Sequence, residues 1–229
     1  MPFLFYDSTM LILLPALILS FYAQYKVQST FNRYISIANY GGYTGAEVAK
    51  KILDAMGLGD IPIDRIGGYL SDHYDPRKKV LRLSDAVYNG RSIAAIGVAA
   101  HEAGHAIQHA NGYVPLSIRN AIVPIANFGS QAAFLFIFLG LIMGAMTMLD
   151  IGIYLFLAVV AFQLITLPVE FNASSRAVEL LSVQGFVTRD EEKSVKKVLN
   201  AAALTYVAAA ASAVAQLLRL LLLRDRRRR

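Results

Sequence analysis

The sequence of 229 residues is 56% hydrophobic and only 17% charged, with a mean hydropathy of +0.47. These values exclude an ordinary water-soluble domain and are typical of a small integral membrane protein. The net charge of +6 is concentrated in the last residues, and the absence of cysteine excludes disulfides, thiolate metal ligands and a catalytic thiol.

The first segment, residues 1–25, is expected to be a transmembrane anchor. Residues 3–24 are apolar apart from Asp7 and are long enough to cross a bilayer as a helix. There is no basic start and no clear cleavage site, so a retained anchor is favoured over a cleaved signal peptide. Residues 26–39 then show helical amphipathic spacing, which predicts a separate helix at the membrane interface or beneath the next domain.

Residues 26–127 form the next predicted domain. A helix should begin after Thr44, because Glu47 three residues later completes a capping box. Alternation between residues 61 and 83 predicts two short strands, separated by the turn-forming segment 72–76. The resulting β-hairpin or small sheet either holds an extended peptide at its edge or only covers the following helix, and the sequence leaves both readings open.

The motif H-E-x-x-H stands at residues 101–105, in a stretch without proline that predicts a helix. His101 and His105 are four residues apart, so they lie on one helix face and can bind one metal ion together. Glu102 is placed to accept a proton from water rather than to bind the metal. Gly104 leaves room over the site or lets a neighbouring helix approach. A zinc site is therefore the working hypothesis, and it makes this domain the catalytic part.

Residues 128–168 are predicted to form a transmembrane helical hairpin with its turn at 148–150. Each half has about the length that a bilayer requires. Gly140 and Gly144 form a small-xxx-small pair that would let the two helices pack closely. Pro168 marks the exit from the membrane.

The Lys and Arg residues predict the topology. Residues 26–127 and residues 168–229 each carry eleven of them, whereas the 148–150 turn carries none. The positive-inside rule therefore places both basic segments in the cytoplasm and the turn outside, which three spans satisfy. A fourth span at 201–223 would place the chain end outside, so this segment is expected to pack on the catalytic part or to lie at the membrane surface.

The last two predicted segments are helices at 169–223, which complete the metal site, and a basic tail at 224–229. The tail either binds anionic phospholipids or serves only as a topology signal. No aromatic or groove-reading element accompanies it, so nucleic-acid binding is not expected.

A catalytic zinc ion usually has three protein ligands, so a third is needed besides the two histidines. His109 lies about 12 Å along the helix axis from His101, too far to share one ion. Asp150 falls on the opposite membrane surface in the predicted topology, and Glu179 sits in a leucine-rich stretch. Glu170 is the best candidate, because small residues on its helix allow close approach to the motif helix. The alternative is that Glu170 only stabilises a helix N-terminus.

Several separated motifs resemble the YugP-like family of neutral zinc metallopeptidases, and the resemblance covers nearly the whole chain. The segment from Val169 to Ala177 is also similar to the segment that follows HExxH in membrane gluzincins of the HtpX and CAAX-protease type. The matching segments are Asp72-His73-Tyr74-Asp75-Pro76-Arg77, Arg82-Leu83-Ser84, His101 to His105 and Ala202-Ala203-Leu204-Thr205-Tyr206.

The resemblance implies one zinc ion bound by His101, His105 and Glu170, with Glu102 as general base. Hydropathy, periodicity and the motifs together predict a mainly α membrane protein, with a gluzincin-like HExxH core, a small β-hairpin or sheet and about three transmembrane helices. Ser174 departs from the Asp of the HtpX-type enzymes, so the residue that orients a zinc-bound histidine is open.

Three polar residues, His73, Arg176 and Tyr206, are candidates for contacts with the substrate or the oxyanion. Each has a simpler interpretation. His73 could be a solvated turn residue, Arg176 could pair with an acid or a lipid phosphate, and Tyr206 could be a packed aromatic.

The functional hypothesis is a membrane-bound zinc endopeptidase that cleaves membrane or misfolded proteins at the cytoplasmic face of a bacterial or archaeal plasma membrane. Its expected partners are a protein or peptide substrate and the lipid bilayer. One alternative is a non-catalytic scaffold that keeps the zinc, although such a site does not need Glu102. Another is a site-2-type intramembrane protease, for which the segment from Leu149 to Gly152 only approximates the required L-D-G.

Overall fold

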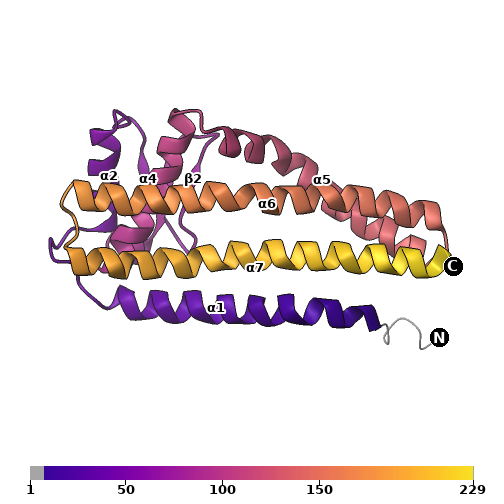
Figure 1. Cartoon of the computed structure of the whole chain (residues 1–229). Helices are drawn as coiled ribbons and strands as arrows, with labels where there is room; N and C mark the ends of the chain where they lie inside the picture. Colours follow the sequence, from indigo (N-terminus) through magenta and orange to yellow (C-terminus); the bar gives the residue numbers. More distant parts are fainter. Residues whose placement is uncertain (1–7, 229) are drawn as a thin grey trace. The chain divides into compact units, whose positions relative to one another are not determined.

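The structure is a computed structural model that describes residues 8–228 (Figure 1). The first seven residues of the predicted anchor, and the last residue of the basic tail, lie outside this described part. The elements in chain order are η1 Ser8–Leu13, α1 Leu14–Ile35, α2 Gly45–Ala55, β1 Ile63–Ile66, β2 His73–Asp75, β3 Val80–Ser84, α3 Asp85–Tyr88, α4 Ile93–Ala110, α5 Val114–Met143, α6 Met146–Val183 and α7 Arg189–Arg228. The expected mainly α fold with a small sheet is confirmed.

The chain folds into two compact units, each assembled from segments that are distant in sequence. The helical unit comprises residues 1–24, 117–168 and 205–229, and the mixed unit comprises residues 25–116 and 169–204. Helices α1, α5, α6 and α7 each contribute residues to both units, because each continues without a break across a unit boundary.

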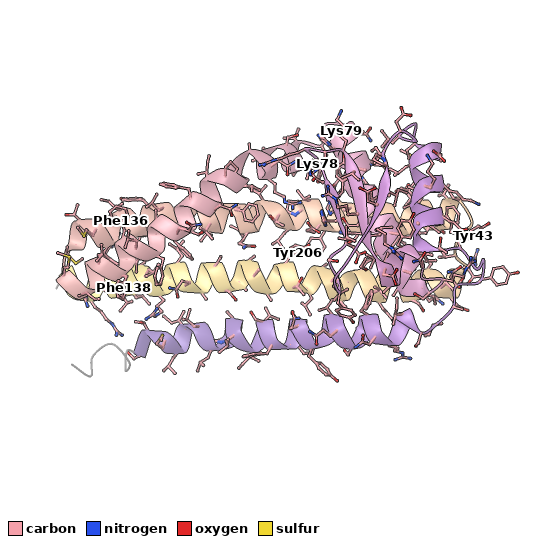
Figure 2. The ribbon with its side chains drawn as sticks, turned by 180° about the vertical axis from the view of Figure 1, so that it is seen from behind. Tyr43, Lys78, Lys79, Phe136, Phe138 and Tyr206 are labelled. Atoms are coloured by element: carbon pink, nitrogen blue, oxygen red, sulfur yellow. The ribbon has the colours of Figure 1, made fainter. Side chains whose placement is uncertain are left out.

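The helical unit exposes large apolar side chains. Phe21, Phe134 and Tyr154 each leave more than two thirds of their surface uncovered, and Figure 2 shows Phe136 and Phe138 on the same helix, α5. Exposing this much apolar surface to water is unfavourable, whereas the hydrocarbon core of a bilayer solvates it well. The helical unit therefore has the surface of a membrane-embedded bundle.

Four helices are long and apolar enough to cross a membrane, judged by length and composition: Ser8–Ile35, Val114–Met143, Met146–Val183 and Arg189–Arg227. The expectation of about three spans is therefore too low. Residues 201–223 are part of the single helix α7, which is a fourth candidate span. The separate interfacial helix predicted at 26–39 is also wrong, because α1 continues unbroken from the anchor.

The basic tail lies at the same end of the helical unit as the turn between α5 and α6. Arg224 lies 3.8 Å from the Asp150 carboxylate near the start of α6, and Arg226 donates a hydrogen bond of 3.0 Å to Ser8. The predicted placement of the tail and the turn on opposite sides of the membrane is therefore wrong. The positive-inside rule is a statistical preference, and most of the Lys and Arg residues still belong to the mixed unit.

The turn of the transmembrane hairpin falls at residues 144–145 rather than at 148–150. Gly140 makes the predicted close helix contact, since a Cβ there would lie 2.7 Å from the backbone nitrogen of Leu149. Gly144 is not part of that packing pair. It has a φ of +67° and forms the turn itself, where glycine is favoured.

The mixed unit contains a three-stranded sheet in the order β1-β3-β2. Strand β1 is parallel to β3, and β2 is antiparallel to it with Tyr74 opposite Leu81. The prediction of two strands separated by a turn at 72–76 is therefore incomplete, because the first part of that segment is an edge strand. The turn follows at Asp75. Its side chain accepts hydrogen bonds from the backbone N–H groups of Arg77 and Lys78.

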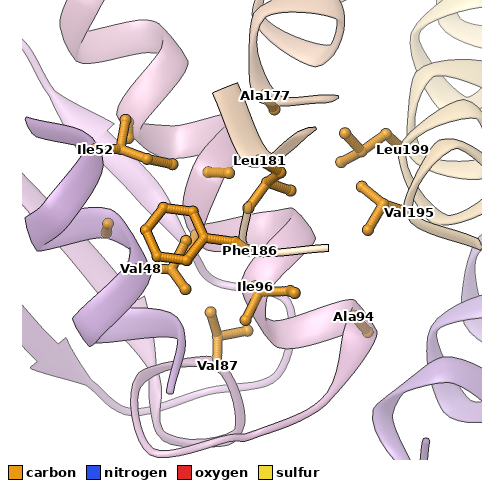
Figure 3. Close-up of a cluster of buried hydrophobic side chains, with 14 of the residues drawn as sticks. Val48, Ile52, Val87, Ala94, Ile96, Ala177, Leu181, Phe186, Val195 and Leu199 are labelled. Atoms are coloured by element: carbon orange, nitrogen blue, oxygen red, sulfur yellow. The ribbon is translucent and has the colours of Figure 1, made fainter. Parts of the chain in front are cut away.

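The core of the mixed unit packs α2, α4, the last turns of α6 and the first turns of α7 together (Figure 3). Val48 and Ile52 come from α2, Ile96 from α4 and Leu181 from α6, and all four are fully buried. The predicted capping box of Thr44 and Glu47 is present at the start of α2. This core fixes α4 against α6, which carry the candidate metal ligands.

Candidate metal centre

Helix α4 carries the HExxH motif and is buried over most of its length. Ser92 caps it by accepting a hydrogen bond from the Ala95 backbone N–H. The small residues that precede the motif let neighbouring elements pack closely around the helix. His101 and His105 lie one turn apart on the same face, with ring centroids 4.7 Å apart.

Helix α6 brings a carboxylate to the two histidines. Oε2 of Glu170 lies 3.3 Å from Nε2 of His101 and 3.5 Å from Nε2 of His105. The Glu170 side chain is 3% exposed, and those of His101 and His105 are 13% and 11% exposed. The three residues thus form one nearly buried group of two nitrogens and one oxygen that could hold a metal ion.

The distances within this group fit a tetrahedral zinc site. Two ligand atoms that each lie about 2.0–2.1 Å from zinc, at a tetrahedral angle, are separated by about 3.3 Å. The two measured nitrogen–oxygen distances of 3.3 and 3.5 Å agree with this separation. Two imidazoles with one carboxylate are also a donor set that zinc prefers in catalytic sites.

The close approach of α4 and α6 depends on a missing side chain. A Cβ on Gly104 would lie 3.0 Å from the carbonyl oxygen of Ala173 and 3.4 Å from its Cα. The predicted role of Gly104, to let a neighbouring helix approach, is therefore confirmed. Ala173 and Ala177 are fully buried on α6, where small residues were expected.

Each histidine has a hydrogen-bond partner on its other ring nitrogen. Nδ1 of His101 lies 3.1 Å from the Ser174 hydroxyl, and Nδ1 of His105 lies 2.9 Å from Oε1 of Gln108. Such partners leave Nε2 of both rings directed at Glu170. This arrangement orients imidazoles for metal binding through Nε2.

Glu102 follows the first histidine but does not join the ligand group. Its Oε2 accepts a hydrogen bond of 3.0 Å from the backbone N–H of Tyr74 on the edge strand β2. The Tyr74 hydroxyl lies 3.0 Å from Nδ1 of His109, further along α4. Strand β2 is therefore attached to α4 at two points, one of them the carboxylate beside the metal ligands.

Burial and the neighbouring carboxylates act in opposite directions on the pKa of His105. Burial lowers the pKa of His105, but the hydrogen bond to Glu170 and the charges of Glu102 and Glu170 outweigh burial and leave it raised. Burial also raises the pKa of Asp72, against the hydrogen bonds that its carboxylate accepts from Ser84. The Glu102 and Glu170 carboxylates thus place negative charge beside His105, which favours a cation there.

Comparisons with known proteins decide the family. Residues 9–225 match the family described as "Putative neutral zinc metallopeptidase". The chain belongs to this family. It is also 52% identical over 208 residues to the "Putative membrane protease YugP" of Bacillus subtilis (strain 168), an alignment that covers 91% of this chain and 92% of that protein. No solved structure matches the chain significantly.

Membership of this family agrees with the resemblance expected from the motifs, and His101, His105 and Glu170 form a group that could hold a metal ion. The remaining predicted site residues are placed differently. His73 lies exposed on β2, where its Nδ1 is 2.8 Å from the Ser71 carbonyl oxygen and its Nε2 is 3.3 Å from Arg82. Neighbouring strand residues point to opposite faces, so His73 points away from the face on which Tyr74 reaches α4.

Arg176 and Tyr206 also stay predictions as substrate contacts. Nε of Arg176 donates a hydrogen bond of 2.8 Å to Oδ1 of Asn172, one turn earlier on α6. Tyr206 belongs to the part of α7 in the helical unit (Figure 2).

Sequence reasoning missed Gln108 and the Tyr74 backbone as neighbours of the candidate metal ligands. Gln108 stands three residues after His105, which is one helical turn, so its spacing was a usable signal. The Tyr74 N–H carries no sequence signal, because every residue except proline has a backbone donor.

Proposed function

We propose that this protein is a membrane-bound zinc endopeptidase. The observation that carries the proposal is the position of Glu102. It is buried beside the His101, His105 and Glu170 group, yet its carboxylate faces the edge strand β2 and not that group. A purely structural metal site does not need a carboxylate at this place, whereas peptide hydrolysis needs a base there.

His101, His105 and Glu170 would hold the ion, and a bound zinc ion would polarise the scissile carbonyl and lower the pKa of water to about 7. Glu102 takes a proton from the attacking water and returns it to the nitrogen of the leaving amine. Glu102 is buried, at 8% exposure, so few bulk water molecules reach its carboxylate.

Strand β2 provides a surface for the peptide substrate. It is an edge strand, and one side of it is occupied by β3. The other side lies next to Glu102, since the Tyr74 N–H points there. An extended peptide can pair with the backbone of such an edge once Glu102 releases the Tyr74 N–H, which would place a scissile bond near the base. His73, Arg176 and Tyr206 are proposed as further contacts to the substrate or the oxyanion.

We assign the mixed unit to the cytoplasmic side, because it contains most of the Lys and Arg residues. The substrates would then be membrane or misfolded proteins of a bacterial or archaeal plasma membrane. Anionic phospholipids are proposed partners of the basic tail, and nucleic acid is not.

The scaffold and site-2-type alternatives receive less support. In a scaffold, Glu102 would serve only to accept the hydrogen bond from the Tyr74 backbone. A site-2-type protease would use the acid of the L-D-G-like segment as a ligand, but among residues 8–228 the group that could hold a metal contains Glu170 and not Asp150.

The test is metal content and proteolysis of the detergent-purified protein. We expect one zinc ion per chain in the wild type and in Glu102→Gln, and much less in Glu170→Ala. Casein cleavage should be lost in Glu102→Gln. Full cleavage by Glu102→Gln would refute the base, full zinc in Glu170→Ala would refute the third ligand, and no zinc in any form would refute the metallopeptidase.

A further inference from the structure

Gln108 connects one candidate metal ligand to the helix that carries another. It lies on α4, one turn after His105, and its side chain is fully buried. Oε1 of Gln108 lies 2.9 Å from Nδ1 of His105. Its Nε2 donates hydrogen bonds of 2.9 Å to the carbonyl oxygen of Val169 and to Oδ1 of Asn172, both on α6. A buried amide with partners on both ends has one fixed orientation.

The orientation of the Gln108 amide follows from the hydrogen bonds that Asn172 makes with Arg176 and Gln108. The Arg176 guanidinium can only donate, so the atom that it contacts on Asn172 must be the amide oxygen. That oxygen and the Val169 carbonyl can only accept, so the Gln108 –NH₂ group must face them. The Gln108 carbonyl oxygen is therefore the atom that faces His105.

The orientation of Gln108 decides the tautomer of His105. Because a carbonyl oxygen only accepts, Nδ1 of His105 must carry the proton. With the proton fixed on Nδ1, Nε2 is the ring nitrogen left to bind a metal ion, and it lies 3.5 Å from Oε2 of Glu170. The same amide holds the peptide carbonyl of Val169, the residue immediately before Glu170.

We propose that Gln108 is a positioning residue of the metal centre. It fixes His105 as the Nδ1–H tautomer for metal binding through Nε2, and it holds the Val169–Glu170 backbone against α4. The inference rests on the proposed function, since it presumes that zinc binds at this group.

The experiment measures zinc affinity by chelator competition with the full-length protein in detergent, so it does not depend on hydrolysis. Gln108→Leu keeps the volume and removes every hydrogen bond, and we expect it to lower zinc affinity by about 10- to 100-fold. Gln108→Glu keeps an acceptor for His105 and loses the donor toward Val169, so its affinity should lie between those of Gln108→Leu and the wild type.

Asn39→Ala is the matched control. Asn39 is another buried amide of the mixed unit, held by the backbone N–H and carbonyl of Tyr43. Its loss should destabilise the fold and leave zinc affinity within about twofold. Wild-type affinity in Gln108→Leu, or an equal loss in Asn39→Ala, would overturn the positioning role. If Gln108→Leu does not fold, the zinc affinity of Gln108→Glu is the test, and a wild-type value would overturn the positioning role. Absence of zinc from the wild type would instead refute the proposed function.

A second feature, independent of the metal centre, is a cationic groove between α1 and α7 within the mixed unit, where the two helices lie side by side (Figure 1). Its volume is about 580 Å³. The residues that line it are Lys26, Ser29, Thr30, Arg33, Tyr34, Lys197, Asn200, Ala201 and Leu204. Spacings of three and four residues place each set on one helix face.

The charge in this groove is not balanced by the protein. Lys26, Arg33 and Lys197 form no ion pair with any residue in the 8–228 range, and no acid is among the lining residues. Lysine and arginine side chains elsewhere on α7, such as Lys193 and Lys196, are paired with acids. Three unpaired cations with neighbouring hydroxyl and amide groups are the chemistry that recognises a phosphate-bearing group.

The position of the groove in the chain indicates the source of that phosphate. Lys26 directly follows the apolar part of the Ser8–Ile35 span, and Ala201 begins the apolar stretch of α7. We infer that these positions lie at the membrane interface and that the groove binds the headgroup of an anionic phospholipid.

Native mass spectrometry of the detergent-purified protein tests this with phosphatidylglycerol, phosphatidylcholine and inorganic phosphate as separate probes. The wild type should retain phosphatidylglycerol in preference to phosphatidylcholine. The variant Lys26→Gln/Arg33→Gln/Lys197→Gln should lose about tenfold or more of that preference. Arg77→Gln/Lys78→Gln/Arg189→Gln removes three exposed charges outside the groove, one of them Lys78 (Figure 2), and should keep it.

An unchanged preference in the groove variant would overturn the inference, and so would an equal loss in the control variant. Binding of inorganic phosphate as tight as that of phosphatidylglycerol would show a free anion site and refute the lipid headgroup.

Discussion

The backbone N–H of Tyr74 donates a hydrogen bond of 3.0 Å to Oε2 of Glu102, so the edge strand β2 is bonded directly to the proposed general base. The Tyr74 hydroxyl adds a second attachment to the same helix, 3.0 Å from Nδ1 of His109. A substrate that pairs with β2 would therefore meet Glu102 in a position set by the protein before binding.

Tyr74→Phe removes the second attachment and keeps the first. We expect a stability loss of about 1 kcal/mol, the usual net contribution of one hydrogen bond. A double-mutant cycle with His109→Phe, followed by thermal unfolding, should show a coupling energy of similar size. Additive effects of the two substitutions would mean that the Tyr74–His109 contact does not attach β2 to α4.

Gly104→Ala should separate the two ligand-bearing helices. Its new Cβ would lie 3.0 Å from the backbone carbonyl oxygen of Ala173, which cannot move without shifting α6. We expect destabilisation of about 1–3 kcal/mol and weaker zinc binding, because Glu170 would be displaced from the histidines. Gly97→Ala on the same helix is the control, since its Cβ meets only side-chain atoms of Val195 at 3.3 Å. Equal zinc affinities in the two variants would contradict this account.

Zinc removal should lower the melting temperature of the wild type. A ligand that binds only the folded state adds about 2.7 kcal/mol at a concentration of one hundred times its Kd. In Glu170→Gln, the melting temperatures of the zinc-loaded and the chelated protein should differ much less. The reason is that the carboxylate beside both Nε2 atoms is replaced by a neutral amide. Thermal scans with and without chelator measure this. The same difference in both proteins would show that Glu170 is no ligand.

The capping box of α2 predicts a pH dependence of stability. Hydrogen bonds from Thr44 hold the pKa of Glu47 below its ordinary value of 4.5. A lowered pKa means that this stabilisation is present above pH 4.5 and is lost as the pH falls through the folded-state value. At pH 7 the metal-free wild type should therefore have a higher melting temperature than metal-free Glu47→Gln. This difference in melting temperature should vanish toward pH 3.

Thr44→Ala is the companion variant for the capping box. The threonine hydroxyl does not titrate, so its loss should cost about 1 kcal/mol at both ends of the pH range. If the melting temperatures of the wild type and Glu47→Gln still differ at pH 3, the stabilisation by Glu47 comes from the shape of its side chain rather than from its charge.

Four spans predict which sites share one side of the membrane. The chain has no cysteine, so single cysteines can be introduced without a background. Thr147→Cys and Asp225→Cys should react with an impermeant maleimide from the same side, and Lys78→Cys from the other. Labelling of Asp225→Cys together with Lys78→Cys would instead restore the three-span topology.

The sequence by itself determined the chemistry of the centre. The four-residue spacing of His101 and His105 fixes their common helix face, and the intervening Glu102 follows from the same motif. Local signals such as the Thr44 capping box also gave correct helix starts, because they depend only on neighbouring residues.

Only the tertiary structure decided which distant groups meet. Glu170 lies 65 positions after His105 and 69 after His101, and Gln108 contacts Val169 on another helix; no periodicity encodes these contacts. The edge position of β2 depends on a parallel pairing of β1 with β3, and the basic tail lies beside Asp150 at the start of α6. Each of these results from packing between segments far apart in sequence, where the burial of apolar surface fixes the position and the polar contacts follow from it.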